Sequence, residues 1–325
     1  MTLRRLALCL VLALLALPSC APAFDLEGHR GTRGLAPENT LAAFRRALAI
    51  GVTTLETDLA VTRDGVLVLS HDPYLNPALT RDASGAWLTQ QGANIHALEL
   101  TQLRRFDVGR LNPAHAYARN WPQQVPADGE RVPTFDELVA LVRARSTTVR
   151  LNIETKITPT SGEEVPAPDA FARLVIAALD RTGMAERTTV QSFDWRTLIA
   201  IKRLRPRQAT ACLTIEAESM NTNLADATGA SPWHAGLRAA EHGSVPRLAK
   251  AAGCEIWSMF WRNLTPELAV EARAVGLRIL PWTVNDPGDM ARLIDLGVDG
   301  LITDYPDRLR QVVAAKGIPL PPAAP

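Results

Sequence analysis

The sequence is poor in cysteine and carries almost no net charge. It has 325 residues, four cysteines and a formal net charge of +1 at pH 7. Without a charge excess or a basic stripe there is no electrostatic argument for nucleic-acid binding, and we expect no nucleic-acid partner. Two of the four cysteines lie within residues 1–23, the other two do not make a disulfide framework, and their spacing does not indicate a metal site. Past Cys20 only Cys212 and Cys254 remain, and both a bridge between them and two buried thiols stay open.

Long apolar runs are also scarce, and the one that stands out is residues 6–17, which follows two arginines. This run is too short for a comfortable membrane span, and its basic flank and the small residues behind it are typical of an export signal. Residues 21–23 (Ala-Pro-Ala) fit ordinary cleavage, whereas residues 17–20 resemble a bacterial lipobox that would leave Cys20 lipid-modified. We therefore expect residues 1–23 to be a signal peptide and the protein to be exported to a bacterial periplasm or cell envelope. In the lipobox alternative the signal ends before Cys20, which then attaches the protein to a membrane.

From residue 24 onward, short apolar strand-like runs alternate with helical ones. The expected strands are 24–29, 53–60, 148–153, 189–193, 209–215, 255–260, 277–284 and 300–303. The expected helices are 40–50 (capped by Asn39), 133–145, 168–181, 195–204, one ending at 252, 266–275, 287–296 and 305–315. Repeated strand–helix units predict a parallel sheet, and eight of them in about 300 residues fit a TIM (β/α)₈ barrel over residues 24–316. An open doubly wound sheet is the alternative, but no dinucleotide glycine motif follows the first strand.

Three segments depart from this alternation. Residues 61–70 read as a hairpin around Asp64-Gly65, a favoured tight-turn dipeptide. Residues 74–132 contain several prolines, tryptophans and tyrosines, and we interpret them as an insertion, either a surface excursion or a lid over a site. The proline-rich tail, residues 317–325, is expected to be loose.

Carboxylates gather at the ends of two expected strands. Side chains alternate along a strand, so Glu56 and Asp58 share one face of the second strand. Glu154 and Lys156 share a face where the third expected strand ends, so a third carboxylate reaches the same mouth of the barrel. Three carboxylates without a nearby thiol make a hard, all-oxygen site that suits Mg²⁺ or Ca²⁺ rather than Zn²⁺. Lys156 is expected either to grip a phosphate oxygen or to pair with Glu56 or Asp58.

Two histidines and an arginine are placed to work beside these carboxylates. His29 ends the first strand and Arg30 follows it, and His71 ends the hairpin. Arg30 offers a planar fork that matches a phosphate group. Two histidines that converge on a carboxylate cluster can serve as base and acid, because their ordinary pKa is near neutral. The other histidines are expected at the surface or behind the site: His96, His115, His234 and His242.

Motifs that run in order from residue 28 to residue 306 resemble the glycerophosphodiester phosphodiesterase family. They are His29-Arg30-Gly31, Pro37-Glu38-Asn39-Thr40, Phe44, Gly51, Glu56-x-Asp58, Thr62-x-Asp64-Gly65, His71-Asp72, Glu154-x-Lys156, Ser192-Phe193-Asp194, Trp282-Thr283-Val284-Asn285 and Gly297-Val298-Asp299-Gly300-x-x-Thr303-Asp304-x-Pro306. The resemblance implies a TIM barrel with a small insertion after the second strand, which residues 74–132 would form. It also implies hydrolysis of a small-molecule glycerophosphodiester to sn-glycerol 3-phosphate and an alcohol.

The resemblance further implies roles for individual residues. His29 and His71 would be the acid–base pair. The cofactor would be a divalent metal, Ca²⁺ or Mg²⁺, bound by Glu56, Asp58 and Glu154. Arg30 and Lys156 would hold the phosphate, and Trp282 would line the glycerol side of the pocket or pack in the barrel core. Arg33, near the mouth, receives no role.

Two other functions remain to be weighed against hydrolysis of glycerophosphodiesters. The first is a related metal-dependent phospholipase or lyase that acts on intact lipid, which Trp87 and Trp121 in the insertion and a lipid anchor would favour. The second is a non-catalytic envelope lipoprotein. The presence of every polar residue that the motifs require argues against it.

Overall fold

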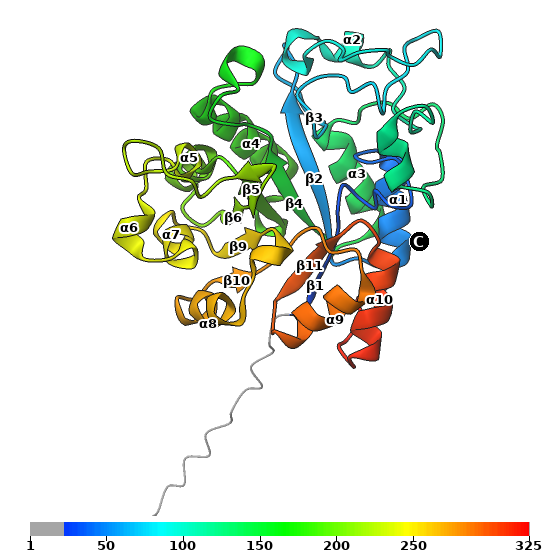
Figure 1. Ribbon diagram of the computed structural model, residues 1–325. Coiled ribbons are helices and arrows are strands. Elements are labelled where there is room, and N and C mark those ends of the chain that lie inside the picture. Colours follow the sequence, from blue (N-terminus) through cyan, green and yellow to red (C-terminus); the bar gives the residue numbers. More distant parts are fainter. Residues whose placement is uncertain (1–22, 325) are drawn as a thin grey trace, which may run out of the picture.

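The computed structural model describes residues 23–324, whose centre is a sheet of eight parallel strands (Figure 1). The expected signal peptide lies outside the described residues, except for residue 23. In spatial order the strands are β10 (Arg278–Ile279), β9 (Ile256–Met259), β6 (Ala209–Thr214), β5 (Thr188–Ser192), β4 (Arg150–Thr155), β2 (Thr54–Val61), β1 (Asp25–Gly28) and β11 (Gly300–Thr303). Backbone hydrogen bonds from Asp299 to Ile279 and from Ile302 to Pro281, both 3.0 Å long, join the two ends of the sheet. The fold is therefore the predicted TIM barrel.

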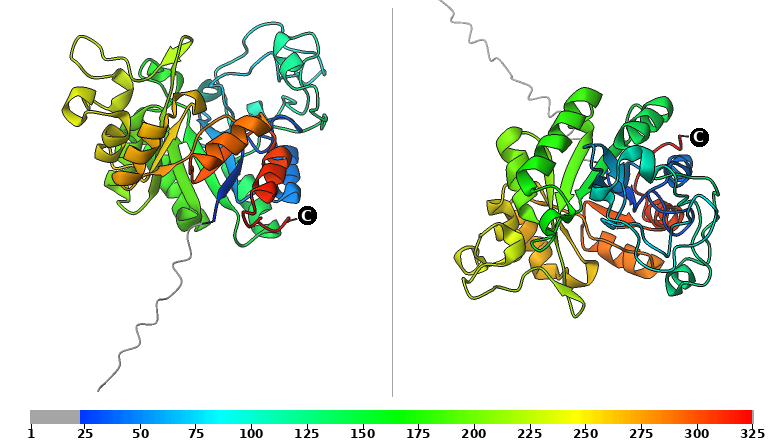
Figure 2. Two further views of the ribbon diagram at one scale, coloured as in Figure 1. Left: turned by 60° about the horizontal axis from the view of Figure 1, so that its bottom comes forward. Right: turned by 90° about the horizontal axis from the view of Figure 1, so that it is seen from above.

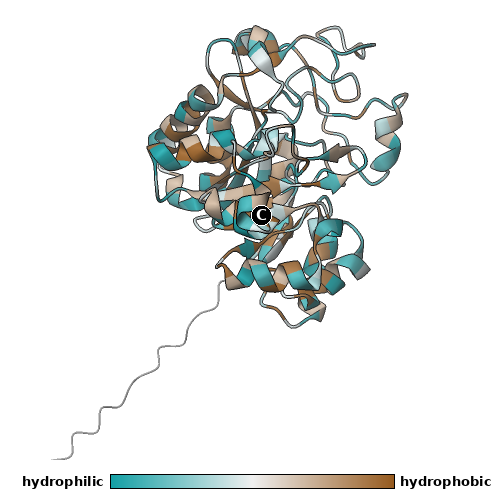
Figure 3. Ribbon diagram, turned by 60° about the vertical axis from the view of Figure 1, so that its left-hand side comes forward, coloured by the Kyte–Doolittle hydropathy of each residue, from teal (hydrophilic) through white to brown (hydrophobic). Residues whose placement is uncertain are grey.

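Helices surround the strands on the outside (Figure 2). The main ones are α1 (Leu41–Ile50), α3 (Phe135–Arg145), α4 (Pro168–Thr182), α5 (Trp195–Leu204), α7 (Val245–Ala251), α8 (Pro266–Ala274), α9 (Pro287–Asp295) and α10 (Pro306–Ala315), and α2 (Leu100–Leu103) and α6 (Ala239–His242) are single turns. Apolar and polar residues alternate along them (Figure 3), as expected where one face packs on the barrel and the other meets water. Within the described residues, none of the helices combines the length and the apolar character that crossing a membrane requires.

Two expected elements differ in the structure. The strand expected over 277–284 is regular only in β10. Leu280 and Trp282 still donate backbone hydrogen bonds to Trp257 and Met259, but Pro281 between them has no N–H group to donate. The helix expected to end at residue 252 is split into α6 and α7. Gly243 takes a left-handed conformation there, with φ of 82°, and the side chain of Ser244 caps α7.

The interior of the barrel has a polar half and an apolar half. Side chains of β1, β2, β4 and β5 bury polar groups inside it: Glu27, Thr54, Glu56, Asn152 and Gln191. On the opposite side the interior is filled by Ala211, Ile256, Leu280 and Ile302, with Trp282 packed against them.

The insertion lies beside the carboxyl end of β2. β3 (Leu67–Leu69) pairs antiparallel with β2, as the hairpin pattern predicts. Residues 74–132 are mostly irregular and share a small core of their own with the hairpin: Ala60, Val68, Leu75, Ile95, Leu103 and Val132. At the other end of the chain, residues 317–324 contain neither helix nor strand, and the carbonyl of Pro321 accepts a hydrogen bond of 2.7 Å from Arg310.

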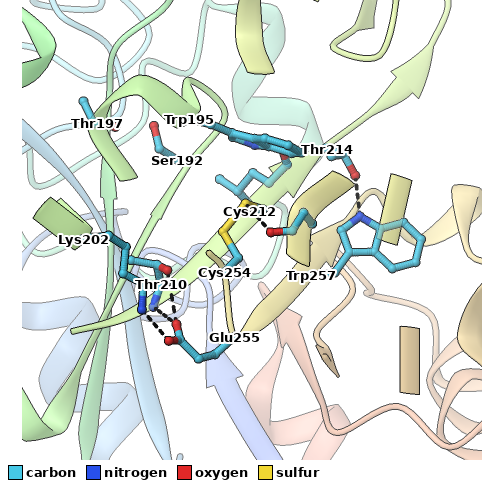
Figure 4. The surroundings of a disulfide bond; sticks show 12 residues. Ser192, Trp195, Thr197, Lys202, Thr210, Cys212, Thr214, Cys254, Glu255 and Trp257 are labelled. Atoms are coloured by element: carbon cyan, nitrogen blue, oxygen red, sulfur yellow. Dashed lines mark hydrogen bonds and ion pairs between the residues drawn. A yellow bond between two sulfur atoms is a disulfide. The ribbon is translucent and has the colours of Figure 1, made fainter. Parts of the chain in front are cut away.

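Cys212 and Cys254 form a disulfide (Figure 4). Cys212 lies on β6, Cys254 lies just before β9, and their Cα atoms are 5.9 Å apart. Both residues are buried. Of the two alternatives that the sequence left open, the structure shows the bridge.

Candidate active site

Seven of the eight predicted site residues line one pocket of about 150 Å³ at the carboxyl end of the barrel strands. They are His29, Arg30, Glu56, His71, Glu154, Lys156 and Trp282. The eighth, Asp58, lies beneath this lining and is 1% exposed. The carboxyl ends of parallel strands meet at one face of a barrel, so residues far apart in the sequence come together there.

The three carboxylates form a compact oxygen cluster. One carboxylate oxygen from each of Glu56, Asp58 and Glu154 lies within 4.8 Å of the others. Asp58 and Glu154 are direct neighbours across the β2–β4 ladder. Burial raises the pKa of Glu56 well above its usual range and also raises the pKa of Glu154. Burial and the neighbouring carboxylates thus disfavour the ionised forms of these two side chains, a cost that a bound cation would offset, and the hard oxygen donors fit Ca²⁺ or Mg²⁺.

The loop after β1 orients two of these carboxylates. Arg30 and Asn39 both take left-handed backbone conformations, with φ of 49° and 56°, which is uncommon for residues with a side chain. The backbone N–H of Arg30 donates to Glu56 Oε2 at 2.7 Å, and Asn39 Nδ2 donates to Asp58 Oδ2 at 2.9 Å. The prediction that Asn39 caps α1 is wrong. Thr40 is the cap, and Asn39 is needed by the carboxylate cluster instead.

The two basic side chains that were predicted to hold phosphate, Arg30 and Lys156, are both paired with carboxylates. Arg30 contacts Glu38 at 2.5 Å and Asp58 at 3.3 Å. Lys156 Nζ lies 2.8 Å from Glu154 and 3.6 Å from Asp58. Burial on its own would raise the pKa of Asp58, but Arg30, His71 and Lys156 outweigh it and lower that pKa. Asp58 therefore stays charged in the centre of the cluster.

Each of the two histidines has a carboxylate at Nδ1. His29 Nδ1 is 2.7 Å from Asp304 Oδ1, and His71 Nδ1 is 2.9 Å from Asp72 Oδ1. A carboxylate only accepts, so each contact requires a proton on Nδ1 and leaves Nε2 as a free base. Burial lowers the pKa of His29 to about 4 and lowers that of His71 as well. Two neutral imidazoles of fixed tautomer therefore face one pocket.

Sequence reasoning missed a second network around His29. Arg33 donates from Nε and Nη2 to Asp304, at 2.8 and 3.1 Å. Its Nη1 reaches the hydroxyl of Tyr117 at 3.2 Å, and that hydroxyl donates to Glu38. The insertion thus supplies a side chain that touches the site. Asp304 lies in a motif that carried the family resemblance, but no sequence signal singles out Tyr117.

Aromatic rings form the apolar wall of the pocket. Trp282 packs edge-to-face with Phe193, with ring centres 5.4 Å apart, and also touches Phe260. Trp282 both lines the pocket and packs on the apolar half of the barrel interior, and its contact with the glycerol side of a substrate stays a prediction. Of the two tryptophans considered for lipid contact, Trp87 lies under Arg81, and Trp121 lies under Arg33, which lines the pocket.

Comparisons with known proteins agree with this architecture. Residues 29–308 match the model of the glycerophosphoryl diester phosphodiesterase family. The chain is 28% identical over 289 residues to a glycerophosphodiester phosphodiesterase of Caldanaerobacter subterraneus subsp. tengcongensis, covering 89% of this chain and 97% of that protein. A crystal structure named for a glycerophosphoryl diester phosphodiesterase from Silicibacter pomeroyi superimposes with a TM-score of 0.80 and 34% identity, over 91% of this chain and 95% of that one. A phosphodiesterase of Oleispira antarctica, solved with sn-glycerol-3-phosphate, has the same fold, with a TM-score of 0.64 and 21% identity over 89% and 96% of the two chains.

Proposed function

The chain belongs to the glycerophosphoryl diester phosphodiesterase family, and we propose that it hydrolyses glycerophosphodiesters to sn-glycerol 3-phosphate and an alcohol with the help of a divalent cation. One observation carries the proposal. Three carboxylates, two histidines and three basic side chains converge on one pocket at the carboxyl end of the barrel. Acid–base groups, cations and an oxygen cluster are what the cleavage of an anionic diester requires.

Glu56, Asp58 and Glu154 would hold the cation, Ca²⁺ or Mg²⁺. When bound, such a cation offsets the charge of the phosphodiester and stabilises the charge that develops in the transition state. Arg30 and Lys156 line the same pocket and would bind the phosphate oxygens. Because both already pair with carboxylates, they are held in place before the substrate arrives.

The two histidines would divide the proton transfers. His29, held by Asp304, would use its free Nε2 to take the proton from the attacking oxygen, which belongs either to water or to the neighbouring glycerol hydroxyl. His71 would act as the acid only after its Nε2 takes up a proton from solvent, to which its side chain is 35% exposed, and it would then pass that proton to the departing alkoxide. Trp282 and Phe193 would pack against the carbon skeleton of the glycerol.

The test uses the purified mature protein and a panel of glycerophosphodiesters. We expect release of sn-glycerol 3-phosphate that stops on chelation and returns with Ca²⁺ or Mg²⁺. His29→Ala and His71→Ala should each lower kcat by about 100-fold or more. Full activity in either variant would defeat the histidine assignment. Release of a cyclic phosphate, or preference for a long-chain lipid over glycerophosphocholine, would favour the lipid-directed alternative.

We also propose that the protein works outside the cytoplasm. The disulfide supports this, since such bonds persist mainly in oxidising compartments, and so does the export-signal pattern of residues 1–23. Mass spectrometry of the protein from its native membrane and soluble fractions distinguishes the two signals. A mature chain that begins at Phe24 indicates ordinary cleavage, and a diacylated Cys20 indicates a lipoprotein. An intact N-terminus in the cytoplasmic fraction would contradict export.

A further inference from the structure

The interior of the barrel contains buried polar side chains that the proposed mechanism does not use. Glu27, Asn152 and Gln191 lie on three different strands, and each is 2% exposed or less. A buried polar group is costly unless it is hydrogen-bonded, so such residues need a structural or functional reason. The reason lies in the contacts that join them to the carboxylate cluster.

The three side chains form a continuous hydrogen-bonded chain that ends on Glu56. Gln191 Nε2 donates to Glu56 Oε1 at 2.9 Å. Asn152 Nδ2 donates to Gln191 Oε1 at 3.0 Å and to Glu27 Oε2 at 2.9 Å. The chain thus runs from β1 through β4 and β5 to a carboxylate on β2.

The carboxylate of Glu56, on which this series of hydrogen bonds ends, determines how both amide groups are oriented. With a cation bound, Glu56 is ionised and only accepts, so Gln191 must turn its amide nitrogen toward Glu56 and its oxygen toward Asn152. Asn152 must then present its own nitrogen to Gln191. Neither amide can flip without placing two donors or two acceptors face to face. Each bond in such a chain also polarises the next, which strengthens the donor that reaches Glu56.

Glu56 is thereby held at both of its oxygens. Oε1 accepts from Gln191, and Oε2 accepts from the backbone N–H of Arg30. Gln191 is also the direct neighbour of Glu154 across the β4–β5 ladder, and it lines the pocket. Gln191 is thus bound to one cluster carboxylate through its side chain and adjoins the residue that carries another through the strand ladder.

We propose that Gln191 is a positioning residue for the cation site, and that Asn152 and Glu27 fix its orientation through the interior of the barrel. The proposal rests on the proposed function, because it assumes that Glu56 binds the cation. Residues that hydrogen-bond metal ligands typically change metal affinity 10- to 100-fold when they are replaced. Gln191 therefore acts on the cation rather than on the reacting atoms.

The test is Gln191→Met, which keeps the unbranched shape and most of the volume but removes the donor. Calorimetric titration of the chelated protein with Ca²⁺, without substrate, should show a Kd raised about 10- to 100-fold. Gln208→Met is the matched control. Gln208 is also 2% exposed, but its amide donates to the carbonyls of Thr188 and Ala185, away from the site. It should leave the Kd within about twofold.

Asn152→Leu provides a second variant that leaves the pocket lining intact. It removes the hydrogen bond that orients the Gln191 amide but keeps the donor of Gln191. The Kd for Ca²⁺ should therefore rise by about 3- to 10-fold, less than in Gln191→Met. This variant decides the question if Gln191→Met folds poorly. The inference is overturned if the first variant that folds leaves the Kd unchanged, or if Gln208→Met raises it equally. Absence of Ca²⁺ and Mg²⁺ binding by the unmodified protein would instead remove the proposed function on which the inference rests.

Discussion

The site geometry makes its most specific prediction for Asp304, a buried residue that does not line the pocket. Its Oδ1 accepts from His29 Nδ1 at 2.7 Å and from Arg33 Nε at 2.8 Å. Its Oδ2 accepts from Asn285 at 2.7 Å and again from Arg33 at 3.1 Å. Asp304→Asn keeps the shape of the side chain but replaces one acceptor by a donor. At least two of these four bonds are therefore lost, and Arg33 loses its counter-ion.

Two quantities should change together in Asp304→Asn. Breaking a buried ion pair from one side costs about 3–5 kcal/mol, which corresponds to a fall in Tm on the order of 10 °C. Without a fixed acceptor at Nδ1, the tautomer of His29 is no longer enforced. The variant should then lose part of the rate acceleration of roughly 10²- to 10⁴-fold that a general base contributes. We expect kcat to fall by about 100-fold or more, with KM changed much less, because Asp304 does not line the pocket.

The assay is steady-state release of sn-glycerol 3-phosphate at 25 °C, well below the expected Tm of the variant. Asp25→Asn is the control, because Asp25 is equally buried and paired with Arg150 and Arg278, but at the opposite end of the barrel. It should lower Tm and leave kcat nearly unchanged. If Asp304→Asn lowers Tm as expected yet keeps kcat within about threefold of wild type, the role assigned to the His29–Asp304 pair is refuted.

Three further predictions concern other parts of the molecule. His234 is buried against Trp195 with no hydrogen-bond partner among the described residues, and burial lowers its pKa to about 4. The unfolded chain binds a proton near pH 6.5, so this group alone should lower the free energy of unfolding by up to about 3 kcal/mol between pH 7 and pH 4. His234→Phe should flatten that decline in urea titrations, and an unchanged pH profile would contradict the burial argument. Replacing Cys212 and Cys254 by alanine opens a loop with a sequence separation of 42 and should cost about 4 kcal/mol in guanidinium titrations. An equal stability of the two forms would show that the bridge does not form in solution. Tyr117→Phe removes the hydroxyl that joins Glu38 to Arg33 and should lower kcat/KM about tenfold, since a hydrogen bond to a charged group contributes about 1.5–3 kcal/mol; a change below twofold would indicate that the insertion does not support the site.

The sequence predicts the barrel well because the fold depends on local signals. Alternating strand and helix patterns, capping residues and turn dipeptides determine most elements, and several bounds agree to the residue, as at α5 and β11. The two departures also have local causes that patterns of apolar residues do not capture. Pro281 withholds a donor from the ladder, and Gly243 breaks a helix in two.

The site was predictable to the extent that strand periodicity orients side chains. Because alternate residues share a face, Glu56, Asp58 and Glu154 could be placed at one mouth of the barrel. Tyr117 could not be predicted, since the path of an irregular insertion depends on its tertiary contacts. His234 illustrates the same limit, because it was expected at the surface or behind the site and stacks on Trp195 in the interior.

The hydrogen bonds that link Glu27, Asn152 and Gln191 could not be predicted from the sequence either. Its links join strands that are distant in the sequence, and single-residue patterns do not reveal which amide faces which carboxylate. The register of β4 with β2 and β5 supplies that information.

The account depends on a cation held by three carboxylates. The most direct measurement is a crystal structure of the protein soaked with Ca²⁺, with the ion located by its anomalous scattering. We predict one peak about 2.3–2.6 Å from a carboxylate oxygen of each of Glu56, Asp58 and Glu154. A cation bound elsewhere, or hydrolysis that requires Ca²⁺ while no peak appears at these carboxylates, would contradict the account.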